Sequence, residues 1–183
     1  MEPNKNMLIV TGSPRRKGNT ELLANAFIKG AEEAGHKVTL FEAGHKKIQG
    51  CRACMKCYSK GQACIYNDDF NEMAPLAEAA DILVLATPLY WFSFPAQIKA
   101  AIDKLFALYV GKRDVKIKAC ALMVCAETDD MIDFEGIVRS YELIFNYLKW
   151  DNSGILLIPN VNLVGDILKT DALDRAEEFG KNI

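Results

Sequence analysis

The chain has 183 residues, with 24 acidic and 22 basic side chains and a formal net charge of -2 at pH 7. Half of the residues are hydrophobic, which is enough to build a core and excludes the disordered class. The length is typical of one domain. The balanced charge disfavours binding to nucleic acid, which depends on neutralising phosphates. We therefore expect one domain over residues 1–183, with no nucleic-acid partner.

Membrane insertion and export are not expected either. No apolar run approaches the ~20 residues needed to span a bilayer. Residues 1–6 lack the charged-then-apolar pattern of a signal peptide. We expect a cytoplasmic protein, in which thiols stay reduced. Its six cysteines should then be ligands, redox groups or core residues rather than a disulfide framework.

Five apolar runs with the near-continuous pattern of strands buried on both faces alternate with five helical patterns. The strands are predicted at 7–11, 37–42, 81–87, 118–125 and 154–159. The helices are predicted at 19–34, 69–80, 95–110, 133–150 and 170–180. This alternation indicates an α/β protein, a doubly wound parallel sheet with helices on both faces. Five strands fit the flavodoxin-like order 2-1-3-4-5, a three-layer sandwich that binds ligands at the carboxyl ends of its strands.

The loop after the first strand, residues 12–20, has the composition of a phosphate site. It leads into a helix start, where backbone N–H groups and the helix dipole attract anions. Ser13 and Thr20 can donate from their hydroxyls and Asn19 from its amide, while Arg15 can offset phosphate charge. The spacing fits neither the Walker loop nor the dinucleotide fingerprint. The alternative is an ordinary helix start with solvated cations.

The loop after the third strand, residues 87–95, contains four aromatic residues and two prolines. The prolines stiffen the backbone. Such a loop can border a flat heterocycle with backbone N–H groups and an aromatic ring. Tyr90 and Trp91 are the expected ligand contacts, and core or interface packing is the alternative for most of the rings.

The loop after the fourth strand, residues 126–130, carries three carboxylates beside the same predicted site. The favoured interpretation is an acidic cap for the following helix, which suits the helix dipole. Contact of Ala126, Glu127 or Thr128 with a ligand is the alternative.

Four of the six cysteines fall at C-x2-C-x2-C-x6-C spacing, at Cys51, Cys54, Cys57 and Cys64. Thiolates at such short steps can converge on one iron–sulfur centre, and nearby lysines would offset its negative charge. Zinc, a reversible disulfide and free thiols are alternatives, although structural zinc sites usually pair two separated C-x2-C steps. Cys120 and Cys125 lie in an apolar strand and are expected to fill the core.

Taken together, these motifs resemble the NADPH-dependent FMN reductase and multimeric flavodoxin family. The segments that carry the resemblance are GSPRRKGNT at 12–20, NDD at 67–69 and ADILVLATPLYWFSFPAQIKAAIDKL at 80–105. The resemblance implies an NAD(P)H oxidoreductase of the flavin or quinone reductase type, with chemistry centred on FMN rather than on a catalytic side chain. It implies that Ser13, Arg15, Gly18, Asn19 and Thr20 hold the FMN phosphate. It also implies that the isoalloxazine ring is bordered by Pro88, Leu89, Tyr90, Trp91 and Phe92. Where the family usually has a glycine-rich turn, this chain has Ala126, Glu127 and Thr128, which we include among the candidate contacts.

The cysteine-rich loop, at about residues 44–68, resembles the compact motif of iron–sulfur flavoproteins. Those proteins join FMN to a [4Fe–4S] cluster and are dimers that exchange electrons with ferredoxin-like partners. The resemblance implies that the cluster ligands are Cys51, Cys54, Cys57 and Cys64. We expect a homodimer that reduces a small-molecule acceptor or a ferredoxin-like protein. The alternatives are an iron–sulfur flavoprotein or flavodoxin-like carrier without its own NAD(P)H activity, and a nucleotide-binding regulatory module.

Overall fold

The computed structural model describes residues 4–183. Residues 1–3, which belong to the segment 1–6 where no signal peptide is expected, lie outside the described residues. The strands are β1 (Asn6–Thr11), β2 (Lys37–Phe41), β3 (Ile82–Pro88), β4 (Ala119–Cys125) and β5 (Asp151–Ile158). They form one parallel sheet in the order β2-β1-β3-β4-β5, which confirms the predicted flavodoxin-like order.

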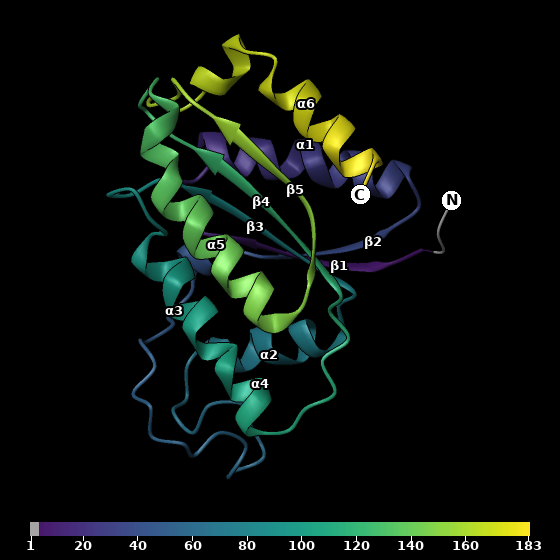
Figure 1. The fold of residues 1–183 in the computed structure, drawn as a ribbon, viewed down its shortest axis with the longest axis vertical. Helices are drawn as coiled ribbons and strands as arrows, with labels where there is room; N and C mark the ends of the chain where they lie inside the picture. The colour runs from purple at the N-terminus through teal and green to yellow at the C-terminus, as the bar shows by residue number, and fades with distance from the viewer. Residues whose placement is uncertain (1–3) are drawn as a thin grey trace.

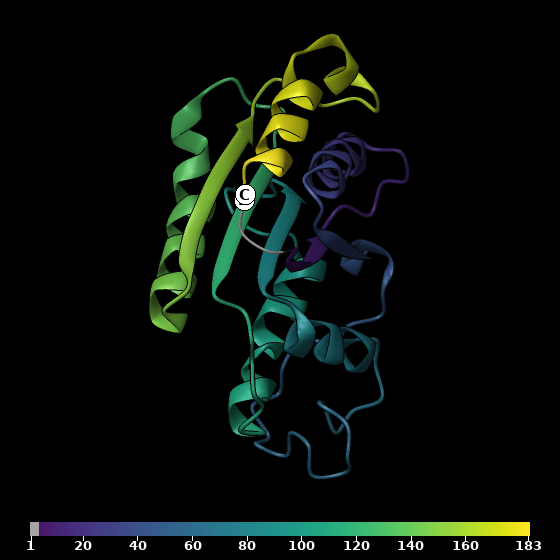
Figure 2. The ribbon, with the colours of Figure 1, turned by 90° about the vertical axis from the view of Figure 1, so that its right-hand side faces the viewer.

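Helices cover both faces of the sheet, as Figures 1 and 2 show. They are α1 (Asn19–Glu33), α2 (Phe70–Ala79), α3 (Ala96–Lys104), α4 (Phe106–Val110), α5 (Glu135–Leu148) and α6 (Ala172–Lys181), with short 3₁₀ turns η1 (Ala43–His45), η2 (Met131–Phe134) and η3 (Asp166–Lys169). α1 and α6 lie on one face, and α2 to α5 lie on the other. Within residues 4–183, no helix combines the length and apolar character needed to cross a bilayer.

The near-continuous apolar strands follow from this two-sided burial. In β1, Met7 and Ile9 pack toward α1 and α6, whereas Leu8 and Val10 pack toward the opposite helices. All four side chains are at most 1% exposed. A strand covered on both faces loses the alternating pattern of a strand with one wet face.

Most predicted elements lie within two residues of the observed bounds, and two differ more clearly from the structure. The helix expected at 95–110 is divided at Leu105, whose N–H bonds to the carbonyl of Ile102 at 3.1 Å. Such a three-residue step interrupts the four-residue helical ladder, although the apolar periodicity continues through it. The last strand begins at Asp151 rather than residue 154, because polar residues pair with β4 at the edge of the sheet.

Glycines allow α1 and α6 to cross closely on their face of the sheet. A Cβ on Gly30 would lie 1.9 Å from the carbonyl oxygen of Glu177, and one on Gly180 would lie 2.2 Å from that of Phe27. Phe27 also meets Phe179 edge to face, with ring centroids 5.4 Å apart. The two helices are thus held at backbone contact distance.

Gly30→Ala should destabilise the protein by about 1–3 kcal/mol, because the added methyl forces the two helix backbones apart. Gly50→Ala is the matched control, since nothing lies within 4 Å of a Cβ at that position. Denaturant unfolding measures both. Equal unfolding free energies for the two variants would contradict the close crossing.

Candidate functional site

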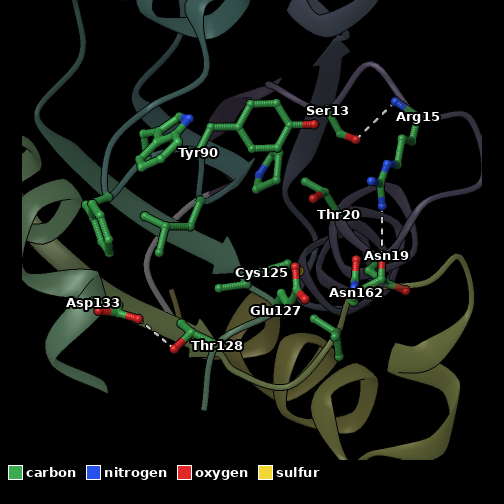
Figure 3. Close-up of a pocket in the computed structure, with 16 residues that line it drawn as sticks. Ser13, Arg15, Asn19, Thr20, Tyr90, Cys125, Glu127, Thr128, Asp133 and Asn162 are labelled. Carbon is green, nitrogen blue, oxygen red and sulfur yellow. Dashed lines mark hydrogen bonds between the residues drawn. The ribbon is translucent and has the colours of Figure 1, made fainter. Parts of the chain in front are cut away.

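A cavity of about 670 Å³ lies at the carboxyl edge of the sheet, within the size range of small-molecule and cofactor sites (Figure 3). Its walls come from the segments that follow β1, β3, β4 and β5. The lining residues are Ser13, Arg15, Asn19, Thr20, Pro88, Leu89, Tyr90, Trp91, Phe92, Cys125, Ala126, Glu127, Thr128, Asp133, Val161 and Asn162.

The start of α1 forms one end of this cavity. Its N-cap residue, Gly18, has no side chain to cap the first backbone N–H groups, so a ligand can approach the positive end of the helix dipole. Ser13 and Thr20 line the cavity and are both less than 10% exposed. The Ser13 hydroxyl oxygen accepts a hydrogen bond from the backbone N–H of Arg15 at 3.2 Å, which fixes the turn. This end of the cavity therefore has the chemistry of an anion site.

Two polar side chains of the first loop are already bonded to the segment after β5. The Arg15 guanidinium donates to the carbonyl of Asn162 at 2.8 Å. The Asn19 amide donates to the carbonyl of Leu163 at 3.0 Å. Its oxygen accepts from the backbone N–H groups of Gly165 and Ile167 at 3.1 and 3.3 Å. Asn19 therefore ties two loops together, in addition to lining the cavity.

A tight aromatic turn forms the opposite wall. Tyr90 and Ser93 pair through two backbone hydrogen bonds of 3.1 and 3.0 Å. At the tip, Trp91 and Phe92 have left-handed φ angles of 45° and 61°, which bulky residues rarely adopt. Trp91 is 92% exposed and Phe92 is 51% exposed. The turn thus holds large apolar rings at the rim of the cavity at a cost in backbone strain.

The loop after β4 caps the following helical turn and also lines the cavity. Asp130 caps η2 by accepting from the backbone N–H of Ile132 at 3.0 Å, as an acidic cap requires. Ala126, Glu127 and Thr128 nevertheless line the cavity. The Thr128 hydroxyl donates to the Asp133 carboxylate at 2.6 Å, which orients the lining side chains.

Cys125 lies at the floor of the cavity and is only 4% exposed. Burial raises the pKa of its thiol to about 12, although a hydrogen bond with Thr20 opposes the shift. The raised pKa favours the protonated, neutral thiol at neutral pH. Neither His36 nor His45 lines the cavity.

Twelve of the thirteen residues predicted to contact a cofactor line this cavity. Gly18 does not line it, since it forms the N-cap behind Arg15. The lining also includes four residues outside the predicted set, Cys125, Asp133, Val161 and Asn162. Val161 and Asn162 follow β5, so the rule that ligands gather at strand carboxyl ends could have found them if extended to the fifth strand.

The four clustered cysteines lie around a second, smaller cavity of about 30 Å³. All four have free thiols. Within residues 4–183, no group of three or more His, Cys, Asp and Glu side chains is arranged to hold a metal ion. Four thiols are the donor set of an iron–sulfur cluster, so the residue types fit such a cluster. Their side chains, however, are not arranged as a coordination shell in the described residues.

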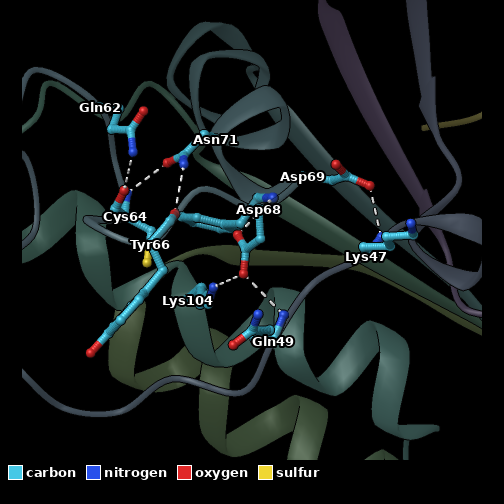
Figure 4. Close-up of polar contacts among 10 residues, drawn as sticks. Lys47, Gln49, Gln62, Cys64, Tyr66, Asp68, Asp69, Asn71 and Lys104 are labelled. Carbon is cyan, nitrogen blue, oxygen red and sulfur yellow. Dashed lines mark hydrogen bonds and ion pairs between the residues drawn. The ribbon is translucent and has the colours of Figure 1, made fainter.

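Both ends of the cysteine-rich loop are tied to the body of the protein by adjacent carboxylates (Figure 4). Asp69 accepts from the backbone N–H of Lys47 at 2.7 Å. Asp68 accepts from the backbone N–H of Gln49 at 3.0 Å and pairs with the ammonium of Lys104 on α3. The side chains of this ion pair are 3% and 4% exposed. Losing one partner would leave a buried charge, which is strongly destabilising.

Further contacts anchor the second half of the loop. The Tyr58 hydroxyl donates to Glu78, whose other oxygen accepts from Arg113 at 3.0 and 2.8 Å. Burial alone would raise the pKa of Glu78, but the hydrogen bonds from Arg113 and Tyr58 hold it below its usual value. The backbone N–H of Cys64 donates to Asn71 at 2.7 Å. These contacts fix the part of the loop that contains Cys57 and Cys64.

The family model for NADPH-dependent FMN reductase matches residues 6–131, so the chain belongs to that family. An iron-sulfur flavoprotein from Archaeoglobus fulgidus is 36% identical over 96 residues, which are 52% of this chain and 43% of that protein. An iron-sulfur flavoprotein from Methanosarcina thermophila is 32% identical over 95 residues, 52% of this chain and 49% of that protein. The match thus spans about half the length of these relatives.

The fold is shared with solved reductase structures. An NAD(P)H:quinone oxidoreductase from Methanothermobacter marburgensis superposes with a TM-score of 0.73, covering 98% of this chain and 96% of that one at 18% sequence identity. At that identity the likeness concerns the fold. It agrees with the flavodoxin-like sheet described above.

Four of the six thiols should react with an aromatic disulfide reagent in the reduced, chelator-treated protein, and two more should react after unfolding. Cys51 is exposed and its three companions are partly exposed. Burial protects Cys120 and Cys125 and raises their pKa values to about 11 and about 12.

Absorbance of the released thiolate counts the reactive groups, and Cys51→Ala should lower the native count from four to three. Six reactive thiols in the native protein would contradict the burial of the β4 cysteines.

Proposed function

We propose that this chain is an FMN-dependent NAD(P)H oxidoreductase of the flavin or quinone reductase type. The observation that carries the proposal is the cavity at the carboxyl edge of the sheet, with an uncapped helix start at one end and an aromatic turn at the other. Membership of the FMN reductase family supports the same cofactor and co-substrate. When bound, FMN supplies hydride acceptance and electron transfer.

The residues of the chain have separate tasks in this proposal. Ser13, Thr20 and the start of α1 hold the phosphate of FMN, and the segment Pro88–Phe92 borders its ring. The buried, neutral thiol of Cys125 would add an uncharged group to the lining of the cofactor site. Binding and orientation are therefore the main contributions of the protein, and no side chain need act as a catalytic acid or base.

The finer part of the proposal is a [4Fe–4S] cluster held by Cys51, Cys54, Cys57 and Cys64. Support comes from the common cavity that these thiols line and from the relatives named iron-sulfur flavoproteins. Arg52 lines the same cavity, where its positive charge suits an anionic cluster. A centre of this kind would pass on single electrons after two-electron input from NAD(P)H.

The proposal includes a homodimer, with a small-molecule acceptor or a ferredoxin-like protein as the electron acceptor. Trp91 and Phe92 line the cavity and are exposed, and the exposed apolar side chains of Met131 and Ile132 directly precede the lining residue Asp133 in the chain. An apolar surface of this kind favours a second subunit over solvent. A flavodoxin-like carrier without NAD(P)H activity is the second candidate, favoured by the cysteine cavity, which suits electron relay.

Protein purified without oxygen should show flavin absorption bands, and addition of NADH or NADPH should bleach them within a stopped-flow experiment. Iron and sulfide analysis of the same sample should find four of each per chain if the [4Fe–4S] cluster is present. No flavin, together with failure to bind added FMN, would contradict the proposed function. Flavin that neither nucleotide bleaches would favour the carrier.

Cys54→Ala separates the two centres. The variant should lose the broad iron–sulfur absorption and keep the flavin bands, because Cys54 does not line the large cavity. Cys120→Ala is the matched control, since Cys120 is buried in β4 and lines neither cavity. Unchanged iron content in Cys54→Ala would refute Cys54 as a ligand.

A further inference from the structure

A fourth loop, residues 159–169 after β5, closes the large cavity between the phosphate end and the loop after β4. We call it the β5 loop. Figure 3 places its Asn162 beside Arg15 and Asn19, on the side of the cavity formed by the start of α1. Val161 and Asn162 both line the cavity. No sequence motif marks this loop, and none of the predicted phosphate or ring contacts lies in it.

Backbone contacts fix one side of the β5 loop to the loop after β4. The N–H of Val161 donates to the carbonyl of Ala126 at 2.8 Å. The N–H of Asn160 donates to the carbonyl of Thr128 at 3.0 Å. These bonds continue the pairing of β4 with β5 beyond the sheet, so the β5 loop keeps its register against that wall of the cavity.

Side chains fix its other side to the phosphate end. Asn19, buried at 8% exposure, makes three hydrogen bonds to the β5 loop, and the Arg15 guanidinium makes one to the carbonyl of Asn162. Within the loop, the Asp166 carboxylate accepts from the backbone N–H groups of Asn162 and Leu163 at 3.2 and 2.7 Å. Both backbone groups of Asn162 are therefore hydrogen-bonded, its carbonyl to Arg15 and its N–H to Asp166.

The side-chain amide of Asn162, in contrast to its backbone, has no protein partner among the described residues. The residue itself lines the cavity. An amide N–H can donate to a phosphate oxygen. The backbone bonds keep Asn162 at the cavity wall, and its side-chain amide lies next to the Arg15 guanidinium and the start of α1, a setting that suits a phosphate monoester.

We propose that the Asn162 side chain is a further phosphate-binding group of the FMN site, and that Asn19 is the residue that positions it. The inference rests on the proposed FMN site and adds a fourth loop to it. We assign Asn19 a positioning role through the β5 loop, because its amide nitrogen donates to Leu163 and its amide oxygen accepts from Gly165 and Ile167.

Affinities of the flavin-free protein for FMN and for riboflavin test the proposal, since riboflavin lacks the phosphate. Asn162→Ala should weaken FMN binding about tenfold, the loss of roughly one hydrogen bond to a charged group, and leave riboflavin binding within about twofold. Flavin fluorescence measures both. Leu163→Ala is the matched control, because this exposed side chain lies in the same loop and does not line the cavity.

Asn19→Ala should lower the ratio of FMN to riboflavin affinity in the wild-type background and change it little in an Asn162→Ala background. The effects of two substitutions are non-additive when both residues act through one contact. Independent structural damage would instead lower the affinities for FMN and riboflavin alike. Asn162 is exposed, so its variant remains informative if Asn19→Ala impairs folding.

An unchanged FMN to riboflavin ratio in Asn162→Ala, or an equal loss for both flavins, would overturn the assignment of Asn162 while leaving the proposed function standing. A wild-type chain that binds neither flavin would overturn the proposed function and this inference with it.

Discussion

The site depends on the pairing of β1 with β3 at the carboxyl edge of the sheet. There the backbone N–H of Gly12 donates to the carbonyl of Ala86 at 2.9 Å. A Cβ on Gly12 would lie 2.6 Å from the Thr87 hydroxyl and 2.8 Å from Ile98, so only glycine permits this approach. β2 lies on the other side of β1, which makes the β1–β3 junction the switch point of the sheet. The start of α1 and the aromatic turn are thereby brought to opposite walls of one cavity.

Around that junction, each of the four loops at the strand ends forms a different part of the cavity wall. The helix start supplies an anion site and the aromatic turn supplies an apolar rim. The loops after β4 and β5 are joined by backbone hydrogen bonds and close the remaining side. The cysteine-rich loop is anchored separately, through the buried Asp68–Lys104 pair and the Tyr58–Glu78 contact. The two cavities share no lining residue, so cofactor binding at one can be altered without rebuilding the other.

Much of this organisation could be predicted from sequence, because buried parallel strands and glycine-rich helix starts leave strong local patterns. The strand order and the contribution of Ser13 and Thr20 to the cavity wall follow from such patterns. The break at Leu105 could not be predicted, since the apolar periodicity of α3 continues into α4. The engagement of Asn19 with Leu163 joins residues far apart in sequence, and no local pattern encodes it. The arrangement of the four thiols likewise depends on anchors outside the motif, such as Lys104 and Glu78.

Hydrogen exchange measured with and without FMN tests most directly the claim that the cavity at the strand ends is the cofactor site. Saturation of the flavin-free protein with FMN should slow amide exchange in residues 12–20, 88–93, 126–128 and 161–163, because these segments line the cavity or form its turns. Exchange at the α1–α6 crossing, remote from the cavity lining, should remain unchanged. Protection confined to the cysteine-rich loop, or absent from the segments after β1 and β3, would contradict the account.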